Sequence, residues 1–413
     1  MTPRNLPDIE RIRTFEAVRR AARPARRAAL ALALPLVVFL IVAFVAPILY
    51  LLVTAVDNPE TRAVLPHTLV ALEAWDGKAT PDEAVFAALA ADLKQAGTDK
   101  TAALVGKRLN YEISGMRSKV LSASRMAAGL NKGPYRDAFL AQDAIWGAVD
   151  TWAVIKRNGK GLTPYYLLTA VDLKQSPGGG IEQVAPDQAI FLSILGRTLL
   201  VAGMVTACTL ILGYPVAYVL TIAPRTVAGI MMLMVLLPLW TSLLVRTTAW
   251  VVLLQSDGVI NSILMALHLT AGKVQLIFTR FGTVTAMTHI QLPFTILPIY
   301  SVMRSIQPTQ LRAARSLGAG PTSAFWRIYA PQTVPGVVAG CLMTFILSLG
   351  YYITPALVGG PQDQMVSNFI STYINRDLNW GLAAALGVVL LIVTMAIYGL
   401  FLRLVGAEKF KLG

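Results

Sequence analysis

The segment LRAARSLGAGPTSAFWRIYAP, residues 311–331, predicts two short helices joined by a glycine turn. Gly318 suits the left-handed position just after a helix, and Pro321 suits the first turn of the next helix. One side of this hairpin is apolar, and a protein rarely leaves such a surface in contact with water. We therefore expect a protein partner there. The residues expected on the exposed apolar surface are Ala313, Ala314, Leu317, Phe325 and Ile328.

Apolar stretches lie on both sides of this hairpin and recur along the chain. The sequence is 55% hydrophobic and 14% charged, whereas soluble domains carry about 25% charged residues. A helix of about 20 apolar residues crosses the roughly 30 Å hydrocarbon core of a bilayer. The sequence therefore predicts an all-α integral membrane protein. The six predicted spans are residues 29–56, 190–222, 227–254, 282–303, 333–353 and 381–404, the third interrupted near Pro238.

The basic residues are distributed unevenly along a chain whose formal charge is +14. Residues 1–28 contain eight arginines and three acidic residues, and residues 304–331 contain four arginines and no acidic residue. Cytoplasmic segments of membrane proteins are rich in Lys and Arg, so six crossings place both termini and the hairpin in the cytoplasm. Basic residues that border membrane spans also argue against a nucleic-acid partner.

Five regions follow from this pattern. Residues 1–28 form a basic cytoplasmic segment, 29–56 the first transmembrane helix and 406–413 the cytoplasmic C-terminus. Residues 57–187, called the insert below, carry equal numbers of basic and acidic residues and are predicted to form a helical extracytoplasmic domain. Residues 188–405 form the main transmembrane domain.

Several local signals predict the structure of the insert. Thr80 is expected to be the N-cap of a helix, with Glu83 completing a capping box. Further helical patterns cover residues 101–128 and 134–156. The Ser-Pro-Gly-Gly-Gly segment at 176–180 predicts a flexible linker to the second span.

The hairpin resembles the cytoplasmic loop of the inner-membrane permeases of binding-protein-dependent ABC importers. That loop has the pattern E-A-A, three residues, G, nine residues, I-x-L-P, and this chain matches it at Ala313, Ala314, Gly318, Ile328 and Pro331. Arg312 replaces the usual Glu, and Ala330 replaces the usual Leu. The resemblance covers roughly residues 188–405. It implies the six-helix type I importer permease fold, with the extracytoplasmic insert added between its first two helices.

The resemblance also implies a role for the loop and a set of partners. The loop at 307–331 is expected to form the coupling helix that sits in a groove of an ATPase dimer, and that dimer binds the ATP and Mg²⁺. A second homologous permease, an extracytoplasmic substrate-binding protein and the lipid of a bacterial inner membrane complete the assembly. The expected coupling residues are Arg312, Ala313, Ala314, Leu317, Gly318, Ala319, Phe325, Ile328 and Pro331.

Four further segments look most like the spermidine/putrescine branch of this family. They are LPLWTS at 237–242, DGVIN at 257–261, QLPF at 291–294 and VGGP at 358–361. The resemblance therefore implies polyamine import. Related permeases carry iron, opines, phosphonates or thiamine, so the substrate stays open.

The sequence lacks the motifs of an enzyme or a metal site. No P-loop occurs, because the AGKV of residues 271–274 fails the required spacing, and energy is expected to come from another subunit. His67, His268 and His289 are scattered without metal-ligand spacing. No nucleophile and base can be paired from the sequence.

Polar residues within or near the spans are candidates for the translocation path, because such groups are costly in lipid and usually face a cavity. Hydrogen bonding between helices and anchoring at the membrane surface explain each of them equally well. The candidates are Trp240, Thr241, Ser242, Arg246, His289, Gln291, Tyr351, Tyr352, Asp377 and Trp380, with Asp363 in the same outer loop as the last two.

Two other classes of function stay open. An ion-driven secondary transporter needs intramembrane carboxylates or broken helices at a central site, and the predicted spans contain no Asp or Glu. A membrane-anchored scaffold would use the insert as its working part. Gly336 and Gly340 form a G-x-x-x-G pattern that predicts close helix packing in the fifth span.

Overall fold

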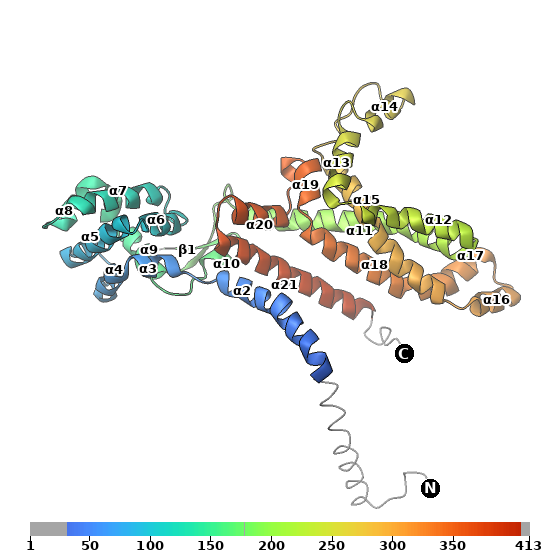
Figure 1. The fold of residues 1–413 in the computed structure, drawn as a ribbon, viewed down its shortest axis with the longest axis horizontal. Coiled ribbons are helices and arrows are strands. Elements are labelled where there is room, and N and C mark those ends of the chain that lie inside the picture. Colours follow the sequence, from blue (N-terminus) through green and yellow to red (C-terminus); the bar gives the residue numbers. More distant parts are fainter. Residues whose placement is uncertain (1–30, 177, 406–413) are drawn as a thin grey trace, which may run out of the picture. The chain divides into compact units, whose positions relative to one another are not determined.

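The computed structural model describes residues 31–176 and 178–405 and divides the chain after Thr54 into two units (Figure 1). The predictions for residues 1–28 and 406–413 lie outside the described residues. The described part of the first unit, residues 31–54, forms a single helix, Ala31–Thr54. Its middle turn, η1 (Ile41–Val45), has π geometry and is followed by α2 (Ala46–Thr54). The apolar side chains of this helix are exposed, as expected for a helix that lies in lipid.

The second unit begins with the insert, which is a small helical domain followed by a two-stranded hairpin. Its apolar core is formed by helix faces that contribute Phe86, Leu93, Val120, Phe139 and Trp152. The elements are α3 (Pro59–Val64), α4 (Pro66–Ala71), η2 (Leu72–Ala74), α5 (Glu83–Thr98), α6 (Ala102–Asn110), α7 (Met116–Gly129), α8 (Tyr135–Gln142), η3 (Ala144–Gly147), α9 (Val149–Asn158), α10 (Tyr165–Thr169), β1 (Leu173–Gln175) and β2 (Ile181–Gln183).

Four predictions for the helices of the insert were wrong. The N-cap of α5 is Asp82, whose carboxylate accepts from the Val85 N–H at 3.3 Å. Glu83 does not close a capping box, because it accepts instead from the Tyr135 and Arg136 N–H groups. The predicted helix at 101–128 is two helices, since Gly115 before α7 has a φ of +78° and is not helical. The predicted helix at 134–156 is also divided, because η3 separates α8 from α9.

The region predicted to be a linker takes part in a β-hairpin. β1 pairs antiparallel with β2, with Lys174 opposite Glu182. Gly179, with a φ of +90°, lies in the connection between the strands. Three-residue strands with a Gly-rich turn carry little periodic signal, which explains why the sequence pattern missed them.

Within the described residues, the regular elements of the transmembrane domain are all helices. Its elements are α11 (Phe191–Ile222), α12 (Arg225–Leu236), η4 (Leu237–Trp240), α13 (Leu243–Leu254), α14 (Val259–Ala266), α15 (Arg280–Ser305), α16 (Pro308–Ser316), α17 (Pro321–Ala324), η5 (Phe325–Tyr329), α18 (Ala330–Gly350), α19 (Ile353–Val358), η6 (Pro361–Asp363), α20 (Val366–Asn375) and α21 (Trp380–Val405).

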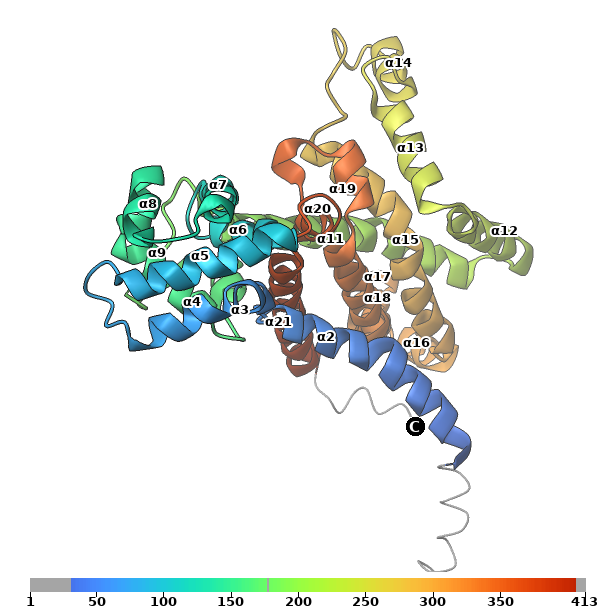
Figure 2. The ribbon, with the colours of Figure 1, turned by 60° about the vertical axis from the view of Figure 1, so that its left-hand side comes forward.

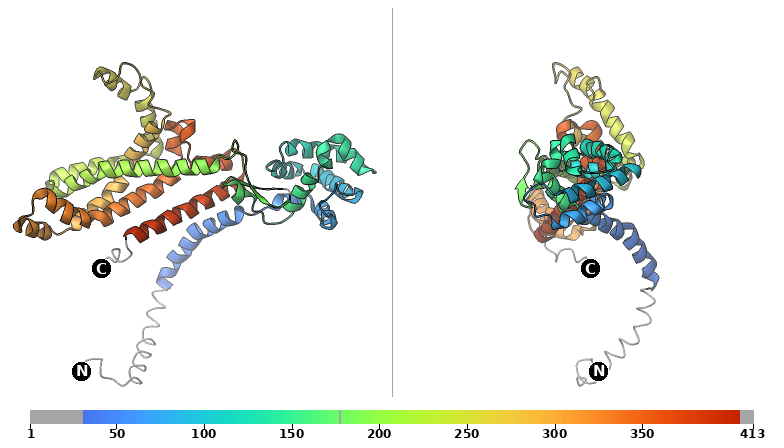
Figure 3. Two further views of the ribbon diagram at one scale, coloured as in Figure 1. Left: turned by 180° about the vertical axis from the view of Figure 1, so that it is seen from behind. Right: turned by 90° about the vertical axis from the view of Figure 1, so that its left-hand side faces the viewer.

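The helices α11, α15 and α18 pack together as the centre of this domain (Figures 2 and 3). Ala217, Ile296 and Tyr329 contribute to their shared apolar cluster. Polar side chains also join them, because the hydroxyls of Thr295 and Thr344 lie 2.6 Å apart. Hydrogen bonds of this kind link helices where no water is present to compete.

The predicted close packing at Gly336 and Gly340 is confirmed. A Cβ on Gly340 would lie 2.8 Å from the Thr295 carbonyl oxygen, and one on Gly336 would lie 2.8 Å from the Cβ of Val302. The backbones of α15 and α18 therefore approach each other more closely than a side chain at either glycine position would permit.

A Gly340→Val variant is expected to push α18 away from α15, because the obstructing atoms belong to the α15 backbone and cannot rotate aside. We expect a loss of folded protein, measured as the monodisperse fraction recovered in mild detergent. Gly350→Val is the matched control, since a Cβ at Gly350 meets nothing within 4 Å. Equal recovery of the two variants would contradict this packing.

The predicted spans differ in detail from the observed helices. Among the described residues, five helical segments are long and apolar enough to cross a membrane: Ala31–Thr54, Phe191–Ile222, Leu243–Ala266, Pro321–Gly350 and Trp380–Arg403. The third predicted span is not one helix, because the chain is extended at Thr241 and Ser242. α13 and α14 then lead away from the central helices (Figure 1). α15 covers the fourth predicted span but is less apolar than these five segments. The number of membrane crossings therefore stays a prediction.

Candidate functional site

The hairpin between α15 and α18 has the predicted glycine turn. Gly318 has a φ of +89°, and its N–H donates to the Arg315 carbonyl at 3.0 Å. The Ala319 N–H donates to the Ala314 carbonyl, also at 3.0 Å. These two bonds are those of a Schellman motif with Gly318 at its left-handed position. Pro321 then occupies the first position of α17, so local chemistry fixes the angle between the two helices.

The exposed apolar surface of the hairpin differs from the one predicted. Leu317 is 89% exposed, as expected, but Ala314 is buried. Phe325 is half-buried, because its ring packs against Tyr218 at 5.4 Å and against Tyr329 at 5.7 Å. Trp326, which the sequence analysis did not select, is 69% exposed. The apolar groups available to a partner therefore include Leu317 and Trp326.

Exposed arginines lie in the hairpin and at the end of α15. Arg304, Arg312, Arg315 and Arg327 are all exposed. The sequence contains no Asp or Glu between Asp257 and Asp363, so no acidic side chain of the hairpin offsets these charges. Among the remaining predicted coupling residues, Ala313 and Pro331 are exposed, and Ala319 and Ile328 are half-buried.

The break before α13 positions several of the candidate path residues. Ser242 is the N-cap of α13, and its hydroxyl accepts from the Val245 N–H at 3.2 Å. Trp240 and Thr241 are exposed at the break. Arg246 lies one helical turn after the start of α13 and is half-buried. Within the described residues its Nε and Nη1 atoms are buried and have no hydrogen-bond acceptor.

Arg246 belongs to a cluster drawn from three elements. His289 on α15 and Tyr351 after α18 both lie within electrostatic range of Arg246. Trp250, one turn further along α13, donates from Nε1 to His289 Nδ1 at 3.1 Å. Trp250 was missed by the sequence analysis, although its four-residue spacing from Arg246 was a signal that both lie on one helix face. Tyr352, beside Tyr351, is exposed.

The other candidate residues do not join this cluster. Gln291 is fully buried and accepts from the Ser348 hydroxyl at 2.9 Å, so it links α15 to α18. Asp377 and Trp380 are exposed at the start of α21, where the Asp377 carbonyl accepts from Lys107 of the insert at 2.7 Å. Asp363, in the same outer loop, is buried and forms an ion pair with Arg280 at 2.9 Å, so its carboxylate already has a partner.

Comparisons with known proteins give the chain its family. Residues 191–408 match the family described as the binding-protein-dependent transport system inner membrane component. The spermidine/putrescine transport system permease protein PotB of Escherichia coli (strain K12) is 30% identical over 204 residues, or 49% of this chain and 74% of that protein. The inner membrane ABC transporter permease protein YdcU of the same strain is 33% identical over 226 residues, or 52% of this chain and 72% of that protein.

One solved structure that is similar to this chain is a bacterial alginate ABC transporter in complex with an alginate pentasaccharide-bound periplasmic protein. It is 17% identical and gives a TM-score of 0.44, with 53% of this chain and 80% of that chain covered. The family match covers more than half of the present sequence. This protein therefore belongs to the inner-membrane components of binding-protein-dependent transport systems, the permease subunits of ABC importers.

Proposed function

We propose that this permease forms half of a solute path and that the hairpin around Gly318 is where the ATPase subunit docks. The observation that carries the proposal is the rigid Schellman turn, which holds the exposed Leu317 next to the exposed arginines of the hairpin. Tryptophan and arginine are enriched among the residues that carry most of the binding energy of protein interfaces, and the hairpin also exposes Trp326. Arg312, in the position of the family's Glu, favours an acidic side chain on the ATPase.

The proposed mechanism is alternating access driven by a partner. The ATPase dimer holds ATP and Mg²⁺, and its closure moves the hairpin together with α15 and α18, between which the hairpin lies. This chain then acts as a transport subunit and not as an enzyme. A second homologous permease supplies the other half of the path, and a binding protein delivers the solute to the side that carries the insert. Both termini lie in the cytoplasm in this arrangement.

We further propose that the solute is a polyamine such as spermidine or putrescine. The support is the resemblance to a permease named for these two solutes, at 30% identity. Iron, opines, phosphonates and thiamine are the alternative solutes. The exposed Asp377 and Trp380 at the start of α21 offer a carboxylate and an aromatic ring, which are the groups that attract organic cations.

The test is uptake by proteoliposomes that contain this permease, its second permease and the ATPase, with the binding protein outside. We expect radiolabelled spermidine or putrescine to accumulate only when ATP is enclosed and the binding protein is present. Accumulation that follows a proton or sodium gradient without ATP would support the secondary-transporter class instead. ATP-dependent uptake of another solute and of neither polyamine would refute the polyamine assignment and leave the importer intact.

A further inference from the structure

A cavity of about 730 Å³ lies in the insert, where α9, α10 and the β1–β2 hairpin meet the first residue of α11. Sites for small molecules in proteins are typically clefts of about 300–1,000 Å³. Its lining combines apolar side chains, such as Ile113 and Val154, with tyrosines and charged groups. The charged groups are Glu112, Asp150, Asp172 and Glu182 on the acidic side, and Arg157 and Lys174 on the basic side.

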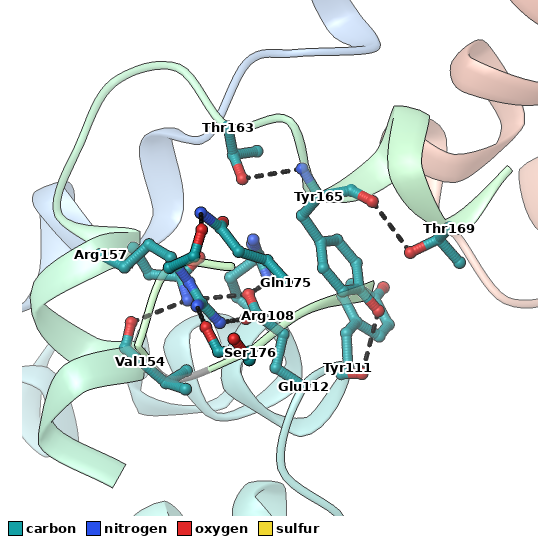
Figure 4. A network of polar contacts seen from close by, with 12 residues as sticks. Arg108, Tyr111, Glu112, Val154, Arg157, Thr163, Tyr165, Thr169, Gln175 and Ser176 are labelled. Atoms are coloured by element: carbon teal, nitrogen blue, oxygen red, sulfur yellow. Dashed lines mark hydrogen bonds and ion pairs between the residues drawn. The ribbon is translucent and has the colours of Figure 1, made fainter. Parts of the chain in front are cut away.

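A buried polar network fixes one wall of the cavity (Figure 4). The Glu112 carboxylate accepts from Arg108 at 3.0 Å, from Asn158 Nδ2 at 2.9 Å and from Arg157. Arg157 also donates to the Ser176 carbonyl at 2.7 Å. Glu112 and Arg157 therefore satisfy each other and have little capacity left for a ligand.

Asp172 is also committed to the fold. Its carboxylate accepts from the N–H groups of Phe191 at 2.9 Å and Leu192 at 2.7 Å, at the start of α11. It thereby satisfies two of the unpaired N–H groups of this helix terminus.

Two carboxylates on different walls remain available. Asp150 on α9 is exposed, and no hydrogen bond or ion pair engages its carboxylate within residues 31–176 and 178–405. Glu182 on β2 lies 4.0 Å from Lys174, and both side chains are more than half exposed. Such surface pairs contribute little energy, so an ammonium group of a ligand can replace Lys174.

The aromatic wall of the cavity offers apolar surface. Tyr111 and Tyr165 lie in the lining, with nearly parallel rings whose centroids are 6.5 Å apart. The Arg108 guanidinium lies 4.7 Å from the centre of the Tyr165 ring, so this ring already takes part in a cation–π contact. Burial, more than any nearby charge, raises the pKa of Tyr111 to about 12. The Tyr111 phenol therefore stays protonated and neutral at physiological pH.

We infer that this cavity binds an aliphatic diamine or polyamine, with one ammonium group at Asp150, another at Glu182 and the methylene chain against the tyrosines. Ammonium groups are pure hydrogen-bond donors, and these two carboxylates are acceptors without strong partners. The inference extends the proposed polyamine import by giving the insert a binding site of its own.

The test is equilibrium dialysis of the full-length permease in a non-ionic detergent, with radiolabelled putrescine and spermidine as probes. We expect saturable binding that weakens about tenfold in Asp150→Asn and in Glu182→Gln, because each variant removes one charge-assisted hydrogen bond. Asp137→Asn is the matched control, because this exposed insert carboxylate lies outside the cavity lining. It should bind like the wild type.

Absence of saturable binding to the wild type would overturn the inference, and so would equal binding by all three variants. Both outcomes are distinguishable from failure of the proposed function. Dialysis uses this chain alone, whereas polyamine uptake needs the ATPase and ATP. Polyamine uptake without saturable binding to the permease alone would support the proposed importer function and refute only the binding site in the insert.

Discussion

A Gly318→Val variant is expected to hydrolyse ATP in the assembled importer while its solute uptake falls by at least about tenfold. Valine is β-branched, and holding it at a φ of +89° costs about 1–3 kcal/mol of strain. The chain would relieve that strain by opening the turn, which breaks the two Schellman hydrogen bonds. The hairpin would then no longer transmit motion of the ATPase to α15 and α18.

Two control variants separate this effect from simple bulk. Gly318→Asn should retain most of the uptake, because Asn tolerates the left-handed conformation better than other residues. Gly320→Val should also be tolerated, since Gly320 has a φ of −63° and a Cβ there meets nothing within 4 Å. Uptake and ATPase activity are measured on the same proteoliposomes. Wild-type uptake by Gly318→Val, with the ATPase still bound, would refute the coupling role.

A Glu112→Gln variant is expected to destabilise the insert by about 3–5 kcal/mol, the usual cost of removing one partner of a buried ion pair. The Arg108 side chain is 1% exposed and that of Glu112 is 7% exposed, so water cannot replace the lost charge. Arg157 loses the same partner. Two guanidinium groups would remain in the interior without a carboxylate.

Hydrogen exchange measured by mass spectrometry checks this prediction locally. Amides of α6 and α9 should exchange roughly 150 to 4,000 times faster if they open with the insert, because each 1.4 kcal/mol is a factor of ten. Glu182→Gln is the matched control, since its pair with Lys174 is exposed and worth about 0–1 kcal/mol. Equal exchange in the two variants would show that the network does not stabilise the domain.

The features that the sequence predicted well depend on local chemistry or on composition. Gly318 and Pro321 have conformational preferences that hold in any fold. The prediction of two short helices joined by a glycine turn therefore agrees with the structure. The apolar stretches predicted helices because only helices and closed barrels satisfy the backbone inside a membrane, although the third predicted span is broken at Thr241 and Ser242. The family resemblance followed from the spacing of a few loop residues and was confirmed by the family match.

The features that the sequence missed depend on contacts between distant residues. Phe325 packs on Tyr218, more than a hundred positions earlier, and no loop pattern shows that its ring turns inward. Asp363 pairs with Arg280 across a separation of 83 residues, so an apparently free carboxylate is neutralised. The break in the third predicted span could partly be predicted from the sequence, because Ser242 is a favourable N-cap residue and lies four positions after Pro238.

A cross-link from the hairpin to the ATPase subunit tests the docking proposal. Leu317→Cys, in a chain whose Cys208 and Cys341 are replaced by serine, places one thiol at a position that is 89% exposed in the wild type. With a maleimide–benzophenone reagent and irradiation in native membranes, docking at the hairpin predicts one main cross-linked product that contains the ATPase subunit. Labelling of this cysteine by an impermeant maleimide from the outer side, with no ATPase adduct, would contradict it.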